Sequence, residues 1–461
     1  MNDEAVKDYE CLLREGSLID AVSRLFSSSW NREHVVQAMQ PSGWLGLYIV
    51  GCFDRRITFY NQQARALSLV RALFELDKLS PGRSVAVVGA GAAGVTAAVA
   101  AARLGCSVTL FEKSDTILHL QATATHRFLH PHLYDWPELG AVESNAGLPL
   151  MDWQADFADK VIDQLRSEFE DEKRECKGRL NQSQALITDI HPRGGRGPFQ
   201  VRWELGQQEA DVVLLTIGFG TEKDEPLYWS GDNLTGPHAG GARKILVSGS
   251  GDGGLIDLAR AALLSPQPPA QEFRHDQAIE WLTSDQDFQC AAYQMLLIDR
   301  NVRRQDLDGD PAFSLYQQYV SRLRVPRTLQ AKLAALVRSN TGVTFNYRHP
   351  GVFSLESSLL NRLLAFLLVQ GKIIDPMQGE IVKYKTVNGK QSLTVKRAGG
   401  QQYSKDFDLV VRRHGPDKNY FKDQFPFLEK ARSELDGKLA GLKLTGTLGD
   451  DTIEWYRTHL R

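Results

Sequence analysis

Three glycines and one acid carry the clearest chemistry in the chain. Gly89, Gly91 and Gly94 form a G-x-G-x-x-G pattern, and Glu112 follows them. Glycine at these positions allows a tight turn, a close backbone approach to a pyrophosphate, and close packing of the helix that comes next. A carboxylate at this spacing is suited to bind ribose hydroxyls. The pattern therefore predicts a dinucleotide site.

The elements that would position these residues follow in order. Residues 85–88 are continuously apolar, as expected of a parallel strand covered on both faces. Residues 95–104 are alanine-rich and predict a helix whose N-terminal N–H groups and dipole face the phosphates. Residues 107–111 read as the second strand, which ends at the acid. A complete strand–turn–helix–strand unit supports the nucleotide interpretation far better than the glycines alone.

A second glycine loop has the same spacing. Gly249, Gly251 and Gly254 follow an apolar strand and open a helix. Asp252 lies inside this loop, where it would repel phosphate unless it caps the helix. No second strand is evident after the helix, so no residue is evident that would bind the ribose of a nucleotide. NAD(P)H binding, a purely structural tight turn and a flavin contact all remain open for this loop.

A loop rich in polar and aromatic residues follows the first unit. Residues 126–136 contain Arg127, His130, His132 and Tyr134. Arginine binds carboxylate or pyrophosphate, histidine carries protons near neutral pH, and an aromatic ring can wall a flavin or substrate. We predict these four as catalytic candidates. The alternative is a buried loop whose polar groups bind the backbone. With no acid or cysteine spaced to complete a site, no metal is predicted.

Composition limits the other possibilities. The chain has 461 residues, 42% of them hydrophobic and 24% charged, with a formal net charge of −2, which gives no electrostatic case for nucleic acid or an anionic membrane. The five cysteines show no C-x-x-C spacing, which argues against a disulfide framework, a zinc cluster and a dithiol centre. The amino terminus has no signal-peptide core and no stretch reads as a membrane span, so we expect a cytoplasmic protein.

Four regions are expected along the chain. Residues 1–80 predict a helical N-terminal segment separate from the nucleotide fold, and residues 81–225 the first unit. Residues 243–416 predict a second unit with a helical insertion and a hairpin at Asn388–Gly389. It ends in Arg412, Arg413 and His414, which either meet an anionic ligand or form a solvated strand end. Residues 417–461 are expected to pack back on the core.

Residues 82–118 strongly resemble the FAD-binding opening of the FAD-dependent oxidoreductases that carry two dinucleotide-binding units, and residues 211–220 are similar to that family's later Ala-Thr-Gly strand. The resemblance implies an α/β, Rossmann-type FAD/NAD(P)-binding flavoprotein fold, here with a helical N-terminal segment and inserted β-hairpins. It implies FAD as cofactor, with NAD(P)H possible. It further implies cofactor-binding roles for Gly89, Gly91, Ala93 and Gly94 at the pyrophosphate, for Glu112 and its neighbour Lys113 at the adenosine ribose, and for Gly218 nearby.

The sequence departs from this family at two places in the first site. No Gly-Gly pair follows the acid, and the ribitol-binding Gly-Asp near the family's carboxyl end has only a near match in residues 446–451. We therefore expect an FAD-dependent oxidoreductase that acts on a small organic substrate, of the amine or amino acid class, or on NAD(P)H. The alternative is a catalytically silent dinucleotide-binding sensor or subunit, whose N-terminal helical segment would dock a protein partner.

Overall fold

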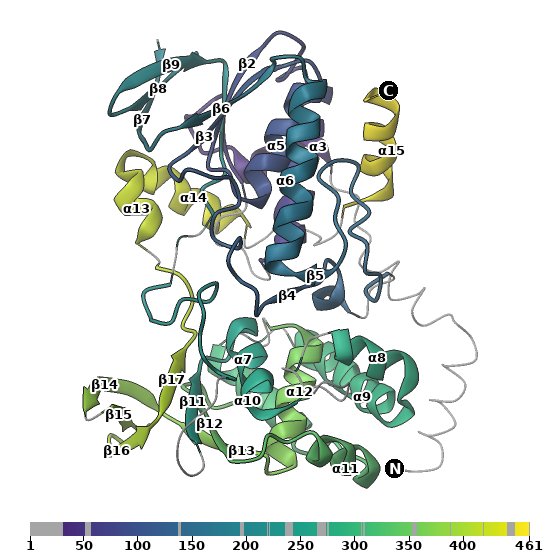
Figure 1. The fold of residues 1–461 in the computed structure, drawn as a ribbon, viewed down its shortest axis with the longest axis vertical. Helices are drawn as coiled ribbons and strands as arrows, with labels where there is room; N and C mark the ends of the chain where they lie inside the picture. Colours follow the sequence, from purple (N-terminus) through teal and green to yellow (C-terminus); the bar gives the residue numbers. More distant parts are fainter. Residues whose placement is uncertain are drawn as a thin grey trace. The chain divides into compact units, whose positions relative to one another are not determined.

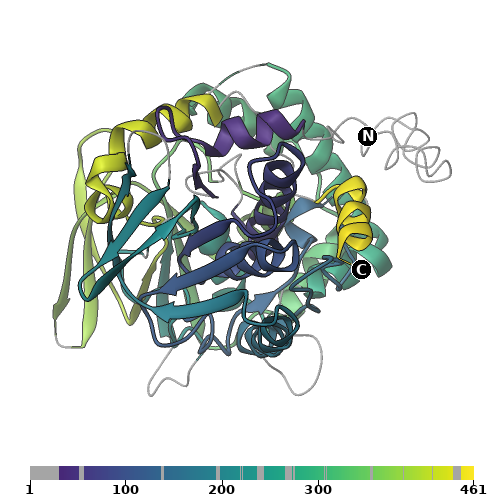
Figure 2. The same ribbon diagram turned by 90° about the horizontal axis from the view of Figure 1, so that it is seen from above.

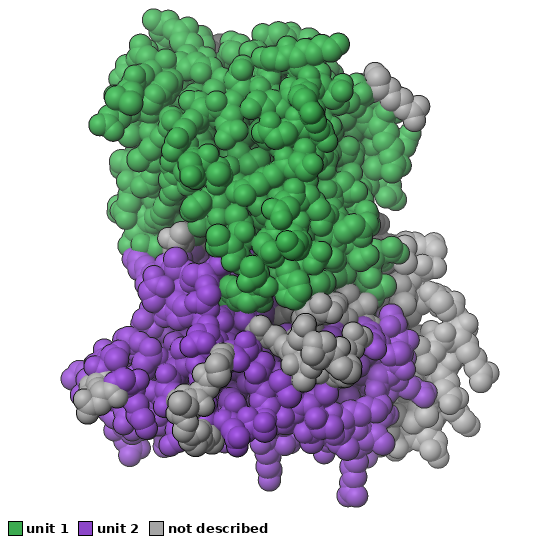
Figure 3. Space-filling view, in the orientation of Figure 1, with its two compact units in different colours: residues 1–221, 417–461 green, residues 222–416 purple. Residues whose placement is uncertain are grey.

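The computed structural model describes two compact units, coloured separately in Figure 3. Unit 1 comprises residues 1–221 and 417–461, and unit 2 residues 222–416. The described residues are 31–50, 57–136, 140–193, 198–218, 220, 222–235, 243–264, 273, 276–305, 307, 309–352, 357–387, 389–417, 419–439 and 448–460. Within these ranges, no helix is both long enough and apolar enough to cross a membrane.

Unit 1 contains a five-stranded parallel sheet (Figure 1). Its order is β1 (Leu47–Ile49), β10 (Val212–Leu215), β2 (Ser84–Val88), β3 (Ser107–Glu112) and β6 (Leu180–Gln184). Figure 2 shows the sheet from above. β2 and β10 are buried almost throughout, as their continuous apolar residues predict for a sheet covered on both faces.

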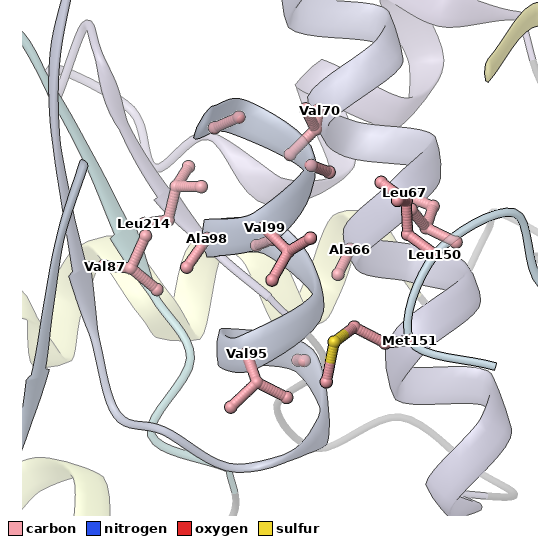
Figure 4. Close-up of a cluster of buried hydrophobic side chains, with 14 of the residues drawn as sticks. Ala66, Leu67, Val70, Val87, Val95, Ala98, Val99, Leu150, Met151 and Leu214 are labelled. Atoms are coloured by element: carbon pink, nitrogen blue, oxygen red, sulfur yellow. The ribbon is translucent and has the colours of Figure 1, made fainter. Parts of the chain in front are cut away.

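Helix α5 (Ala92–Arg103) is the centre of the unit 1 core. It joins β2 to the parallel strand β3, and ten of its twelve residues are buried. Figure 4 shows Val95, Ala98 and Val99 of α5 among side chains from the sheet and from α4 (Phe59–Glu75). α6 (Ala158–Glu175) packs on α5 with its apolar stripe. The alanines of α5 keep it thin enough for this close packing.

The N-terminal segment differs from the prediction. The described residues of this segment form α3 (Arg32–Met39), β1 and α4. β1 is the edge strand of the five-stranded parallel sheet and pairs in parallel with β10. The segment is therefore neither wholly helical nor separate from this fold. β1 has only three residues, and its partner β10 lies far along the chain, so the local sequence pattern does not predict this strand. α4 begins at the carboxyl edge of the sheet, the same edge as α5.

Short antiparallel pieces and the carboxyl-terminal region complete unit 1. β7 (Ile187–Pro192), β8 (Phe199–Trp203) and β9 (Gly206–Ala210) form one antiparallel sheet, and β4 (Phe128–Leu129) pairs with β5 (Asp156–Phe157). The remaining elements of unit 1 are η1 (Leu133–Asp135), α13 (Tyr420–Gln424), η3 (Pro426–Leu428), α14 (Glu429–Leu439) and α15 (Asp450–His459). α15 covers α4: Tyr456 Oη donates to Leu67 O at 2.8 Å, and Arg71 Nη1 donates to Thr452 Oγ1 at 2.9 Å.

Unit 2 repeats the parallel plan. Its sheet runs β13 (Ile374–Gln378), β12 (Thr341–Tyr347), β11 (Arg243–Ser248) and β17 (Leu409–Arg412), all parallel. α7 (Asp252–Ala262) follows β11, and α12 (Leu359–Gln370) joins β12 to β13. β14 (Glu380–Val387), β15 (Lys390–Lys396) and β16 (Gln402–Phe407) form an antiparallel sheet, which bears out the predicted hairpin, although Asn388 lies outside the described residues.

The second strand of unit 2 was missed by the sequence reasoning. β12 pairs with β11 from Arg243–Thr341 to Ser248–Asn346, so the strand–helix–strand unit is complete. In the described part of the segment between α7 and β12, the structure has four helices: α8 (Asp276–Ser284), α9 (Gln286–Arg303), α10 (Gly309–Val320) and α11 (Arg327–Ala335). Arg362 of α12 anchors this insertion, because its fully buried guanidinium donates to Asp299 at 2.6 Å and to Tyr316 at 2.9 Å.

A half-buried carboxyl group ties α6 to a neighbouring loop. Glu168 accepts a hydrogen bond from Met151 N, and Met151 O accepts one from Gln63 Nε2 of α4 at 2.8 Å. Trp153 Nε1 donates to the same glutamine at 2.7 Å. Burial raises the pKa of Glu168 from 4.5 to about 7. The carboxyl group therefore keeps its proton to a higher pH in the folded protein than in the unfolded chain.

We predict that replacing Gly94 with alanine disrupts unit 1. A Cβ at Gly94 would lie 1.8 Å from Gly89 O and 2.7 Å from Thr216 Oγ1, so the helix must move off the strand. The expected loss is about 3 kcal/mol or more of unfolding free energy. Gly91→Ala is the matched control, because nothing lies within 4 Å of its added Cβ. Thermal unfolding of both variants tests this, and equal midpoints would contradict it.

We predict a pH-dependent stability that Glu168→Gln removes. Because the pKa of Glu168 is raised on folding, its stabilising contribution is complete below about pH 4.5 and is lost as the pH rises through about 7. The midpoint of thermal unfolding should fall between about pH 5 and pH 8, and less so in Glu168→Gln. The exposed Glu170 on the same helix provides the control, since Glu170→Gln should follow the parent protein.

Candidate functional site

The first glycine loop leaves an open cradle at the start of α5. Gly89 has a φ of +98°, and an added Cβ there would lie 2.8 Å from Thr216 O, so only glycine fits the turn. Gly91 is the N-cap of α5, no described side chain caps this helix, and an added Cβ at Gly91 meets nothing within 4 Å. The helix therefore presents its N-terminal N–H groups at an unfilled space, the arrangement that binds phosphate.

Glu112 is held against this loop at the end of β3. Its Oε2 accepts from Ala90 N at 2.8 Å, and its Oε1 accepts from Ser114 N at 2.9 Å. Two backbone donors thus fix the carboxylate beside the turn, as expected of a residue that reads a ribose. Lys113 points elsewhere, since its Nζ donates to Tyr420 Oη at 3.3 Å.

Two further residues of unit 1 were predicted to bind the cofactor, Gly218 and Ala93. Gly218 lies just after β10, at the carboxyl edge of the sheet, and has a φ of +68°. Ala93 is buried in the core at the first turn of α5.

Thr216 was not predicted. Its buried hydroxyl lies 2.9 Å from Val88 O and 2.7 Å from Gly89 O, so it joins β10 to the glycine turn. The signal available in the sequence was its place in the strand that resembles the Ala-Thr-Gly segment.

The loop of residues 126–136 makes extensive contacts within the protein. Arg127 is 2% exposed, and its carbonyl oxygen accepts from Ala158 N at 2.7 Å. His130 Nδ1 accepts from the backbone N–H groups of His132 at 3.2 Å and Leu133 at 3.0 Å. His130 thus shapes the turn that precedes η1, in which the half-buried Tyr134 lies.

His132 binds the backbone as well. Its Nε2 lies 3.0 Å from Asn145 O, its ring packs edge-on against Tyr60 of α4 at 4.5 Å, and burial lowers its pKa. Both histidines therefore have backbone partners, as the structural alternative requires. A catalytic role for Arg127, His130, His132 and Tyr134 stays a prediction. Among the described residues, no group of three or more His, Cys, Asp or Glu is arranged to hold a metal ion.

The chain between Glu112 and residue 126 runs close to the first glycine loop. Leu118 N donates to Ala90 O at 2.8 Å, so the chain that leaves Glu112 passes the glycine turn before it reaches residue 126. Sequence reasoning missed that α4 takes part here through Tyr60, because it placed the N-terminal segment outside the nucleotide fold. β1 and α4 are integral to unit 1, and partner binding through residues 1–80 stays a prediction.

The second glycine loop has the geometry of the first. Gly249 has a φ of +127°, and its added Cβ would lie 2.2 Å from Arg413 O. A Cβ at Gly254 would lie 2.0 Å from Gly249 O, whereas one at Gly251 meets nothing within 4 Å. No described side chain caps α7. Unit 2 therefore presents a second open helix N-terminus at the carboxyl edge of its sheet.

Asp252 does not cap its own helix, so that part of the sequence interpretation was wrong. Its Oδ1 accepts from Ser358 N at 2.8 Å and from Asn361 Nδ2 at 2.7 Å, both at the start of α12. The cause is the proximity of two helix N-termini, which no local pattern reveals. One oxygen of the carboxylate is therefore held at the start of α12.

The arginines after β17 are engaged by acids of the same unit. Arg413 donates to Asp257 at 2.8 Å and to Glu222 at 3.2 Å, and Arg412 pairs with Asp224 at 2.7 Å. Arg413 is 5% exposed, so it is part of a buried ion-pair cluster and not of a solvated strand end.

Comparison with known proteins supports the resemblance in unit 1. Residues 84–212 match the FAD dependent oxidoreductase family. No curated protein matches the chain. Among solved structures, the chain is similar to thioredoxin reductase from Lactococcus lactis, with 14% identity over 74% of this chain and 80% of that one and a TM-score of 0.39. Bacillithiol disulfide reductase from Staphylococcus aureus gives 12% identity, 74% and 80% coverage, and a TM-score of 0.38.

The residues present fit FAD. The unfilled cradle at Gly91, the uncapped α5 and the fixed Glu112 supply the pyrophosphate and ribose ends that this cofactor requires. Gly89 and Gly94 keep the helix close to the turn. These residues would orient FAD along the carboxyl edge of the unit 1 sheet.

We predict that Gly91→Val abolishes FAD retention without unfolding the protein. The branched side chain would occupy the space open to the pyrophosphate, while no protein atom lies within 4 Å of its Cβ. Flavin content per polypeptide after gel filtration measures the effect. Gly399→Val is the control, because this exposed glycine is equally unobstructed and should leave flavin content unchanged. A yellow, fully loaded Gly91→Val protein would contradict the site.

Proposed function

We propose that this FAD-dependent oxidoreductase, whose family domain spans residues 84–212, draws its reducing equivalents from NADPH bound to unit 2. The observation that carries the proposal is the complete strand–glycine loop–helix–strand unit of β11, α7 and β12, with an open cradle at Gly251. An enzyme with two such sites is a reductase or monooxygenase, since an oxidase has no need of a nicotinamide nucleotide.

Two observations support a nucleotide in unit 2. Asp252 is hydrogen-bonded to the start of α12, so its charge is not aimed at the phosphate position above Gly251. β12 lies beside β11 in parallel, so an adenosine ribose has a strand end to lie against.

The end of β12 favours NADPH over NADH. The second strand of unit 1 ends at Glu112, whose carboxylate suits a free ribose hydroxyl, but β12 ends at Tyr347 and is followed by Arg348. Arg348 is exposed, and no acid stands at the corresponding place. Next to it, His349 stacks on Phe313 at 4.7 Å. A guanidinium at this position is suited to a ribose 2′-phosphate, which a carboxylate would repel.

The residues of the chain bind and orient, while the flavin supplies the redox chemistry by accepting a hydride and passing the electrons on. The helix N-termini of α5 and α7 would hold the two pyrophosphates. No C-x-x-C spacing exists, and Cys106 and Cys176 are buried, so we propose a small organic acceptor and not a dithiol relay. The amine or amino acid class and a cytoplasmic setting stay predictions.

Anaerobic titration of the FAD-loaded protein tests the proposal. We expect NADPH to bleach the flavin band, and NADH to do so only at higher concentration. Bleaching by an amine or amino acid without any response to NADPH would indicate an oxidase. Nucleotide binding without bleaching would indicate the silent sensor.

We predict that Arg348→Gln weakens NADPH binding about tenfold and leaves NADH binding unchanged, because only the 2′-phosphate contact is lost. The dissociation constants of both nucleotides measure this. Arg322→Gln is the control, because it removes an exposed positive charge from the helical insertion of the same unit. Equal losses for NADPH and NADH would contradict the assignment of Arg348.

A further inference from the structure

Four polar side chains meet at the carboxyl edge of the unit 2 sheet. His414, two residues after β17, has its Nδ1 3.1 Å from Asp224 Oδ2 and its Nε2 2.8 Å from Ser248 Oγ. Ser248 ends β11, and its Oγ lies 2.7 Å from Asn346 Oδ1 on β12. The chain Asp224–His414–Ser248–Asn346 crosses three strands next to the second glycine loop.

The direction of these hydrogen bonds is fixed from one end. Asn346 Nδ2 donates to Met377 O at 3.0 Å and to Gly379 O at 3.1 Å, so its Oδ1 faces Ser248 and needs a donor. Ser248 has a single hydroxyl hydrogen, which this contact uses. Ser248 Oγ must then accept from His414 Nε2–H.

Matching donors to acceptors along this chain of hydrogen bonds also requires a proton on Nδ1 of His414. Its Nδ1 faces the Asp224 carboxylate, which only accepts hydrogen bonds. With Nε2–H committed to Ser248, the Asp224 contact is made only if Nδ1 is protonated as well. The imidazolium satisfies all four groups, whereas either neutral tautomer loses one hydrogen bond.

In the free protein this proton is held weakly. Burial lowers the pKa of His414, Asp224 opposes this effect, and the positive charge of Arg412 adds to it. These are the charged groups that act on the ring, and Arg412 itself pairs with Asp224. The side chain of His414 is 46% exposed, so an incoming ligand can reach it.

His414 lies on the nicotinamide side of the proposed nucleotide. In the sheet, β12 and β17 flank β11 on opposite sides. A dinucleotide over the glycine loop places its adenosine toward the second strand, β12, and its other half toward β17. The carbonyl oxygen of Arg413, the residue before His414, touches the position where Gly249 would carry a Cβ.

We propose that His414 takes up a proton when the anionic nicotinamide dinucleotide binds at residues 249–254. The proposal rests on the proposed function. The two negative phosphates favour the charged imidazole, and protonation completes the hydrogen bonds to Asp224 and Ser248. The affinity for the dinucleotide therefore falls as the pH rises. The fall is about tenfold for each unit by which binding raises the pKa of His414.

Isothermal titration of the FAD-loaded protein with NADP⁺, which has no hydride to transfer to the flavin, counts the protons of binding directly when it is run near pH 7 in two buffers of different ionisation heat. We expect net uptake in the parent protein that is lost in His414→Gln. Asp224→Asn should reduce the uptake, because it removes the carboxylate that favours the imidazolium. His34→Gln, at an exposed histidine of unit 1, should match the parent. Titration of the 2′-phosphate is common to all variants and cancels in the comparison.

The outcomes separate the two proposals. NADP⁺ binding with the same proton count in the parent, His414→Gln and Asp224→Asn would overturn the role of His414 and leave the proposed function standing. Absence of binding of both NADPH and NADP⁺ to the parent protein would overturn the proposed function, and this inference with it. Thermal unfolding of each variant confirms that folded protein is compared.

Discussion

Each unit depends on a helix that packs so closely against a glycine turn that no side chain fits between them. In unit 1 the contact is Gly94 against Gly89 O, and in unit 2 it is Gly254 against Gly249 O. This approach leaves the helix N-terminus uncapped at the carboxyl edge of a parallel sheet, where its dipole faces open space. The neighbouring strands hold the turn in place: Thr216 binds it from β10, and the backbone at Arg413 abuts it from beyond β17. The same constraint, met twice, gives each unit a helix N-terminus whose geometry suits a phosphate-bearing ligand.

The fold could be predicted where its signals are contiguous. Residues 84–112 carry strand, turn, helix, strand and acid in one short stretch, and the structure reproduces each of them. β12 could not be found, because four inserted helices separate it from α7. β1 could not be found because three residues carry no periodicity, and β10 stabilises them from far along the chain. At residues 126–136 the residue types suggested chemistry, but the partners that decide their roles, such as Asn145 and Ala158, lie in another segment.

Both glycine loops carry an acid nearby, and the surroundings of each acid determine its effect. Glu112 is held by two backbone N–H groups of its own unit's turn and strand end. Asp252 lies inside its loop, and its Oδ1 accepts hydrogen bonds from two donors at the start of α12. Hydrogen bonds of this kind fix where a carboxylate's charge lies and reduce its repulsion of a neighbouring anion. Spacing in the sequence cannot distinguish these cases, because the donors come from elements that the loop meets only in the folded chain.

Unit 1 is interrupted between residues 221 and 417, and this order has a consequence during synthesis on the ribosome. The sheet strands β1, β2, β3, β6 and β10 all emerge before unit 2, but α15, which covers α4 through Tyr456 and Thr452, emerges last. One face of α4 therefore stays uncovered while the whole of unit 2 is translated. Unit 2 begins and ends at neighbouring points, since Glu222 and Pro416 form a bridge, so it is able to fold as a nested module in that interval. The nascent chain then has all five strands of this sheet, while α4 and the sheet face later covered by Phe421, Phe425 and Leu428 stay exposed until residues 417–460 are made.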